Sequence, residues 1–253
     1  LLLRALPHGE VISHLGRKSR SNKAISKIIP ISEKPIPASM IMFDLFQSSS
    51  KDMDSIHLNS LNLPNRFIDL RDYLIIHIGT NHHARLWPLD LIRLLFSLAQ
   101  ETKKTIVLTG FRQEVVYQDE LEQIIDSHRH TIKIVNLMGQ TSLRELLELV
   151  SNAKGIISVD TGIIHWARLF LVPNISLMGQ SDNKLFGVKS PYFKLSRSIA
   201  SEPLACQDKQ TFHGIKINWV NTCARNECHL PSRLCFDGIN RQQIEKDFFE
   251  LFG

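Results

Sequence analysis

The chain has 253 residues, of which 43% are hydrophobic and 22% are charged, so it is not disordered along most of its length. The formal net charge of +5 is mild, and without aromatic–basic interleaving or zinc-finger spacing it gives no support for nucleic-acid binding. The most apolar stretch, 155–179, is interrupted by Asp160, His165 and Arg168, which excludes a bilayer-spanning helix there. We therefore expect a soluble protein of the cytoplasm.

The first 66 residues have no regular pattern. Three prolines between positions 30 and 37 argue against a helix or strand there. We interpret the basic cluster Arg17–Arg20 as solvated surface; the alternative is contact with an anionic partner such as a membrane surface. We expect two regions, a partial N-terminal region over 1–66 and a main domain over 67–253.

From Tyr73 onward, short β-rich runs alternate with amphipathic stretches. Such alternation predicts βαβ units and a parallel, Rossmann-like sheet, in which ligands bind at the carboxyl ends of the strands. The predicted strands are 74–78, 105–108, 132–135, 155–159 and 174–177. The predicted helices begin at Pro88 and near Gly162, cover 114–126 and 143–150, and include a final one around 244–251.

The segment Asp160–His165 directly follows a predicted buried strand. We expect Gly162 to permit a tight turn and close approach of a ligand. The N–H groups of the helix that follows would attract a phosphate, and His165 could add a donor to the same anion. The alternative, equally supported by spacing alone, is a structural helix cap at Asp160 or Thr161 with a buried histidine.

The segment that follows the first predicted strand, 79–88, would lie at the same edge of the sheet. Thr80 and Arg85 can both bind phosphate oxygens, although a plain polar loop explains them equally well. We interpret the adjacent pair His82 and His83 as an exposed loop, since neighbouring side chains diverge and no carboxylate is near. Trp87 is expected in the core.

Two further segments follow strands of the same sheet. Glu114 could accept hydrogen bonds from a ribose, or serve only as a first-turn helix residue. Thr141 lies in a turn before a capped helix, which alone indicates a structural role. Because all four segments would gather at one edge, a nucleotide site is better supported than any one of them suggests.

Four cysteines lie late in the chain, at Cys206, Cys223, Cys228 and Cys235, with His229 beside one of them. They include no Cys-x-x-Cys pair, so the spacing is a weak indication of a metal site. Reduced, packed thiols are the expected state in a cytoplasmic protein. A cysteine-bound metal or a disulfide is the alternative.

Three segments together resemble glycosyltransferase family 9, the ADP-heptose:lipopolysaccharide heptosyltransferases, in its C-terminal domain. They are Arg85–Pro88, Asn136–Leu143 and Asp160–His165, and they occur in the family's order. Gly179–Asp182 resembles the Gly-Pro-Thr-Asp turn that follows in the family. The resemblance covers residues 73–182 well and the cysteine region more loosely.

The resemblance implies a GT-B fold, in which two Rossmann-like domains enclose a nucleotide-sugar donor. ADP-heptose is the implied donor, and no cofactor or metal is implied at the donor site. By the same resemblance Thr80 and Arg85 would hold the donor phosphates, Glu114 the ribose and Thr141 the base, while Asp160, Thr161, Gly162 and His165 would form the donor loop. Arg85 stands where a lysine is common in the family, which keeps the charge but changes its geometry.

One departure from the family concerns the acceptor side. Family members place a full acceptor domain, with the presumed catalytic aspartate, before the matching domain, whereas only about 66 residues precede it here. We therefore expect a truncated N-terminal domain and assign no catalytic base. The leading hypothesis is inverting transfer of a heptose-type sugar to a lipopolysaccharide-type acceptor at the inner face of the inner membrane. The alternatives are a non-catalytic nucleotide-sugar-binding module and a protein glycosyltransferase relative with a cysteine-bound metal.

Overall fold

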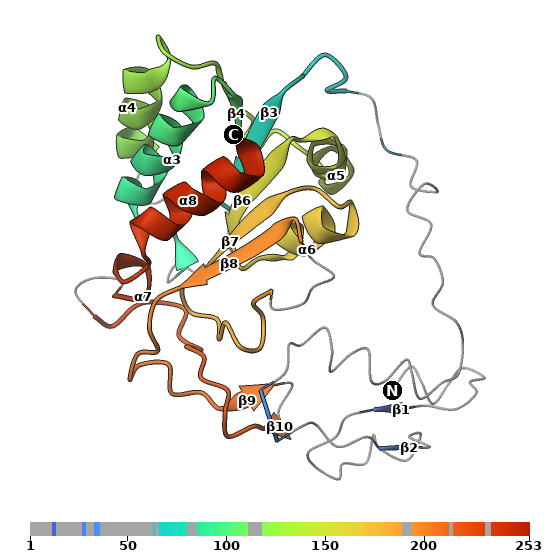
Figure 1. Ribbon diagram of the computed structural model, residues 1–253, viewed down its shortest axis with the longest axis vertical. Coiled ribbons are helices and arrows are strands. Elements are labelled where there is room, and N and C mark those ends of the chain that lie inside the picture. Colours follow the sequence, from blue (N-terminus) through green and yellow to red (C-terminus); the bar gives the residue numbers. More distant parts are fainter. Residues whose placement is uncertain are drawn as a thin grey trace.

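The computed structural model describes residues 12–13, 27–28, 33–35, 63, 66–79, 85–110, 118–188, 194–212, 215–230 and 234–253. Its centre is a six-stranded sheet in which every neighbouring pair of strands is parallel (Figure 1). The strands are β3 (Tyr73–His77), β4 (Thr105–Thr109), β5 (Ile134–Asn136), β6 (Gly155–Val159), β7 (Asn174–Met178) and β8 (Ser196–Ala200). They are arranged in the order β5-β4-β3-β6-β7-β8.

Helices cover both faces of this sheet, which makes the domain a three-layer α/β structure. Helices α3, α4 and α8 pack on one face, and α5 and α6 on the other (Figure 1). The helices are α3 (Leu89–Glu101), α4 (Gln118–His128), α5 (Leu143–Asn152), α6 (Gly162–Leu169), α7 (Leu234–Asp237) and α8 (Arg241–Phe252). Among the described residues, no helix is long and apolar enough to span a bilayer.

The central strands are apolar on both faces because both faces are covered. In β3 all five residues are buried. Leu74 and Ile76 belong to the cluster beneath α3, α4 and α8, while Tyr73 and Ile75 belong to the cluster beneath α5 and α6. This alternation follows from the two-residue repeat of a strand, and continuous apolar runs are typical of buried parallel strands.

The order of the strands creates a switch point between β3 and β6. After β3 the chain adds β4 and then β5 on one side, and afterwards returns to add β6, β7 and β8 on the other. The connections that leave β3 and β6 at their carboxyl ends therefore diverge to opposite sides of the sheet. A crevice forms at such a point in open parallel sheets, and ligands bind there.

The predicted Rossmann-like sheet is confirmed, and each of the five predicted strands is present within one or two residues of its expected bounds. The sixth strand, β8, was not predicted, because only Ser196 and Ile199 of its five residues are buried and its sequence lacks an apolar run. Part of the predicted helix 114–126 lies outside the described residues, and α4 is described from Gln118. Most of the N-terminal region 1–66 also lies outside them; within it, β1 (Ile12–Ser13) pairs in parallel with β2 (Lys27–Ile28). The domain boundary at 66/67 stays a prediction.

A less regular part of the chain follows the sheet. Residues 204–230, which we call the cysteine lobe, contain a short antiparallel pair, β9 (Thr211–Phe212) and β10 (Ile215–Lys216). The lobe shares a small apolar cluster with Leu185, to which it contributes Ile217 and Val220. Hydrogen bonds to the turn after β7 attach it to the sheet, among them Cys223 N–H to the Gln180 carbonyl at 3.0 Å.

Candidate functional site

A cleft of about 700 Å³ opens at the carboxyl ends of the strands, where the strand order reverses. The connections after β3, β4, β5 and β6 all contribute to its walls. Its lining residues are His77, Gly79, Arg85, Gly110, Gly139, Thr141, Ser142, Leu143, Leu146, Thr161, Gly162, Ile163 and Trp166. The predicted convergence of four loops at one edge is therefore present in the residues that the structure describes.

Two of these connections touch each other at glycines. Gly110 has a φ of +140°, and a side chain there would bring a Cβ atom to 2.6 Å from the backbone nitrogen of Gly79. Both the backbone conformation and the contact exclude any larger residue. Backbone therefore lines the cleft at Gly79 and Gly110, which lets a ligand approach these two connections closely.

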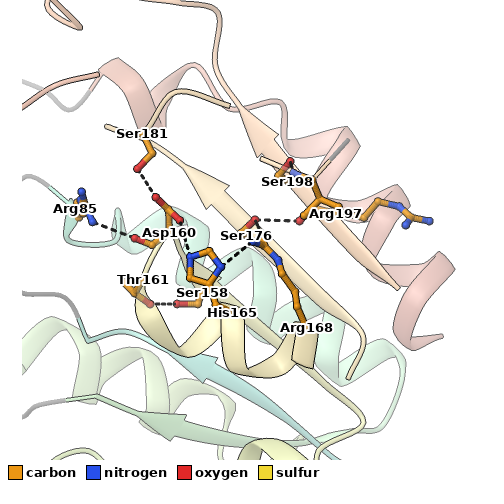
Figure 2. A network of polar contacts seen from close by, with 11 residues as sticks. Arg85, Ser158, Asp160, Thr161, His165, Arg168, Ser176, Ser181, Arg197 and Ser198 are labelled. Carbon is orange, nitrogen blue, oxygen red and sulfur yellow. Dashed lines mark hydrogen bonds and ion pairs between the residues drawn. The ribbon is translucent and has the colours of Figure 1, made fainter. Parts of the chain in front are cut away.

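Asp160 lies at the end of β6 and is buried, with 9% of its surface exposed. Its Oδ2 accepts a hydrogen bond of 2.5 Å from the Ser181 hydroxyl, and its backbone carbonyl accepts one of 3.1 Å from Arg85 Nη1 (Figure 2). Asp160 therefore orders the turn that begins α6 through its own contacts, and its side chain does not cap that helix.

The first turn of α6 faces the cleft without a side-chain cap. Thr161 is the residue before the helix, but its hydroxyl lies 3.1 Å from that of Ser158 and makes no capping bond. A helix start of this kind offers backbone N–H donors and the positive end of the helix dipole to an anion. The structural-cap interpretation of the segment is therefore wrong for the Asp160 and Thr161 side chains.

The structure corrects one prediction about Gly162. Its backbone has no positive φ, so the turn does not require glycine there. A Cβ atom on Gly162 would meet no protein atom within 4 Å, which places it against open space at the cleft. Close approach of a ligand is the remaining reason for a glycine at this position.

His165 lies on α6 between Asp160 and the buried cation Arg168 (Figure 2). Its Nδ1 is 3.1 Å from Arg168 Nη1 and its Nε2 is 3.9 Å from Asp160 Oδ1. Because a guanidinium only donates, Nδ1 accepts and the ring proton is on Nε2, toward the carboxylate. Partial burial lowers the pKa of His165, the Arg168 charge lowers it further, and Asp160 opposes both. The ring is therefore neutral near pH 7, and its side chain is half exposed rather than buried as the structural alternative required.

Arg168 extends this network across the sheet. Its Nη2 donates to the Ser176 hydroxyl at 3.1 Å, and Ser176 in turn donates to the carbonyl of Arg197 in β8 (Figure 2). Its Nε is buried without a hydrogen-bond partner in the described part of the chain. Burial lowers the pKa of Arg168, and the Asp160 carboxylate opposes that shift. The positive charge of the Arg168 guanidinium is therefore held on α6, behind the turn that faces the cleft.

His77 also lines the cleft and was not among the predicted site residues. It is the last residue of β3, its Nδ1 lies 2.9 Å from Thr109 Oγ1, and burial lowers its pKa to about 4. His77 is therefore neutral at physiological pH. The sequence signal that could have identified it is a lone histidine within the apolar run of the predicted strand 74–78.

The predicted site residues fall into three groups. Four of them, Arg85, Thr141, Thr161 and Gly162, line the cleft directly. Asp160 and His165 lie behind the turn and contact one another rather than forming its wall. Thr80 and Glu114, like the pair His82 and His83, lie outside the described residues. Trp87 is fully buried in the core, as predicted.

The four cysteines gather at a different place. Cys206, Cys223, Cys228 and Cys235 line a cavity of about 20 Å³ at the base of the cysteine lobe, and none forms a disulfide. Burial raises the pKa of Cys235 to about 11, and the charges of the other three cysteines raise it in the same direction. Over the described ranges, no three histidine, cysteine or carboxylate side chains are arranged to hold a metal ion. The cysteine-bound metal remains a hypothesis.

Comparisons with known proteins were made for sequence and for structure. The sequence model of glycosyltransferase family 9 (heptosyltransferase) matches residues 28–216, most of the chain. No curated protein matches the sequence. Among solved structures, E. coli heptosyltransferase WaaC with ADP-2-deoxy-2-fluoro heptose has a TM-score of 0.57 at 20% identity, over 95% of this chain and 66% of that one.

Two other E. coli structures are similar. WaaC with ADP has a TM-score of 0.52 at 23% identity, over 69% of this chain and 53% of that one. ADP-heptose lps heptosyltransferase II has a TM-score of 0.50 at 18% identity, over 72% of this chain and 46% of that one. The chain thus spans from 46% to 66% of the length of these structures. They share its α/β fold of the GT-B type, and with the family model covering most of the sequence, the chain belongs to glycosyltransferase family 9, the heptosyltransferases.

Proposed function

We propose that the chain is the donor-binding part of a heptosyltransferase, which moves a heptose-type sugar from ADP-heptose to a lipopolysaccharide-type acceptor with inversion. One observation carries the proposal: the uncapped start of α6 and the guanidinium of Arg85 face the same cleft at the switch point of the sheet. Both present positive charge or N–H donors to a ligand, which suits a diphosphate.

The chemistry requires stabilisation of the leaving group. An acceptor hydroxyl attacks the anomeric carbon from one face while the bond to the diphosphate oxygen breaks on the other. Negative charge then builds on the departing ADP. The first-turn N–H groups of α6 and the Arg85 guanidinium would bind that charge, since donors fixed in place need no reorganisation when the charge develops. We assign no catalytic base.

The apolar part of the cleft lining suits the nucleoside. Leu143, Leu146, Ile163 and Trp166 supply this apolar surface, and Thr141 also lines the cleft. A planar base can pack against such a surface while a hydroxyl such as that of Thr141 offers a hydrogen bond. Glu114, for which the resemblance implies a ribose contact, keeps that role as a proposal.

The acceptor and the place of action are proposed from the family resemblance. A lipopolysaccharide-type acceptor is anchored in a membrane, so we propose that the protein acts at the inner face of the inner membrane, with peripheral contact to it.

Calorimetry with ADP and ADP-heptose tests donor binding. We expect binding to the wild type and at least about tenfold weaker binding to Asp160→Ala, because that variant releases the Ser181 bond and loosens the turn. Asp126→Ala, on the exposed face of α4, is the matched control and should bind like the wild type. A wild type that binds neither ligand, or an Asp160→Ala variant that binds equally well, would count against the proposal.

A turnover assay separates the enzyme from the binding module. Release of ADP that depends on a lipopolysaccharide-type acceptor would support the transferase, whereas donor binding with no transfer would favour the non-catalytic module. Elemental analysis of the same preparation tests the cysteine-bound metal. A metal-free protein would remove that alternative.

A further inference from the structure

Gln180 is a buried glutamine between the cleft and the cysteine lobe, and only 3% of its surface is exposed. It belongs to the turn after β7. Its Oε1 accepts a 2.9 Å hydrogen bond from Nε of Arg85, and its Nε2 donates a 2.7 Å bond to the backbone carbonyl of Arg225. Both ends of the amide are therefore occupied, one toward the cleft and the other toward the lobe.

The contact with Gln180 fixes the orientation of Arg85. Arg85 uses Nε on Gln180 and Nη1 on the carbonyl of Asp160, at 2.9 and 3.1 Å. Both acceptors are uncharged, so they hold the guanidinium without cancelling its positive charge. A guanidinium has five N–H donors, and among the described residues the remaining ones have no partner, so they can bind an anion in the cleft that Arg85 lines.

Gln180 is itself held by the cysteine lobe. Its carbonyl accepts the Cys223 N–H at 3.0 Å, in addition to the side-chain bond to the Arg225 carbonyl. Arg225 is anchored in turn, because its guanidinium binds the Cys206 carbonyl at 2.7 Å and the Asp208 carboxylate at 2.7 and 3.2 Å. The side-chain amide of Gln180 therefore links the position of the Arg85 guanidinium to that of the lobe.

We infer that Gln180 is a positioning residue for donor binding, which ties Arg85 to the cysteine lobe so that its guanidinium faces the diphosphate. The inference rests on the proposed function. A long arginine side chain loses rotamer freedom when it binds an anion, and one that is already held loses less. The same two positions depart from the family pattern described above, where a lysine and a proline would form neither bond.

Isothermal calorimetry with ADP on the full chain, arranged as a double-mutant cycle, tests the inference. Gln180→Met keeps the length of the side chain and removes both amide bonds, and we expect ADP to bind about tenfold more weakly. In the Arg85→Ala background the same change should have almost no further effect. Gln210→Ala is the control, since Gln210 lies in the same lobe and, within the described part of the chain, its side-chain amide binds only the Asn218 carbonyl.

A second measurement needs no ligand. In the free protein the Arg85 Nε–H, assigned by its loss in Arg85→Ala, should exchange slowly with solvent in the wild type and rapidly in Gln180→Met. If Gln180→Met does not fold, Arg85→Lys replaces it, because lysine keeps the charge and lacks the Nε–H; it should also weaken ADP binding about tenfold.

The outcomes separate the two proposals. Equal exchange of the Arg85 Nε–H in wild type and variant, or a Gln180→Met penalty that is as large without Arg85 as with it, would overturn the positioning role alone. A wild type that binds no nucleoside diphosphate would overturn the proposed function, and the role of Gln180 in donor binding with it.

Discussion

The parallel sheet and the cysteine lobe are stabilised in different ways, although they meet at one turn. The sheet has two large apolar clusters, and its strands are buried on both faces. Among the described residues, the lobe contributes two buried apolar side chains to the small cluster that it shares with Leu185, and polar contacts at the Gly179–Asp182 turn hold it in place. Apolar burial is roughly proportional to area and tolerant of detail, whereas each hydrogen bond depends on a specific donor and acceptor. The sheet therefore determines the fold, and the lobe adjusts the positions of groups at the cleft.

The largest expected effect compares matched isoleucines. Ile157 in β6 is fully buried in the larger cluster, and Ile217 is 5% exposed in the lobe. We expect Ile157→Ala to lower the free energy of unfolding by about 4 kcal/mol and Ile217→Ala by about 2 kcal/mol, because the smaller cluster can relax around the lost atoms. Urea denaturation measures both. Equal losses would show that the lobe is packed as firmly as the sheet.

The next effect is the pH dependence of the free energy of unfolding that arises from His77, the last residue of β3. Burial lowers the pKa of His77 to about 4, while an unfolded histidine has a pKa of about 6.5. Between these values the unfolded chain binds a proton that the folded chain does not. Stability is therefore unaffected by His77 above about pH 6.5 and falls as the pH drops toward 4, by roughly 3 kcal/mol in full.

Denaturation at pH 7 and at pH 5 measures this contribution. We expect His77→Gln to lose less stability between the two pH values than the wild type. The exposed His130, replaced in the same way, is the control. A His77→Gln protein with an unchanged pH dependence would mean that the folded chain takes up the proton at this site without cost.

The third effect tests how the lobe is attached. Asp182 is buried, and its two carboxylate oxygens accept from the backbone N–H groups of Asn221 and Lys184, each at 2.7 Å. We expect Asp182→Ala to cost about 2 kcal/mol, since hydrogen bonds to a charged acceptor are lost and two backbone donors remain unpaired. Hydrogen exchange should rise in the lobe at 215–222 and stay unchanged in β3. Asp182→Asn, which keeps one acceptor, should fall between alanine and wild type.

The two regions also differ in what the sequence reveals. Apolar runs predict β3, β4, β6 and β7 because burial on both faces leaves a continuous pattern, and β8 has none. The loops of the cleft could be located because they follow predicted strands. The contacts that shape the cleft could not, since Arg85 and Gln180 are 95 positions apart and only the folded chain brings them together. At Gly162 the sequence predicts a requirement that the fold does not have: the glycine suggests a tight turn, but the backbone there has no positive φ and the turn can be made without glycine.

The smallest expected effect is at the junction of the two regions. Ser181, 5% exposed, donates its hydroxyl to Oδ2 of Asp160, which joins the turn after β7 to the turn after β6. Ser181→Ala should lower the free energy of unfolding by only about 1 kcal/mol, because the carboxylate keeps access to its other contacts. It should nevertheless weaken ADP binding more than Ser127→Ala, a control whose hydroxyl has partners only within α4 among the described residues. If both variants bound ADP equally, the turn after β7 would affect ADP binding through the contact of Gln180 with Arg85 and not through the contact of Ser181 with Asp160.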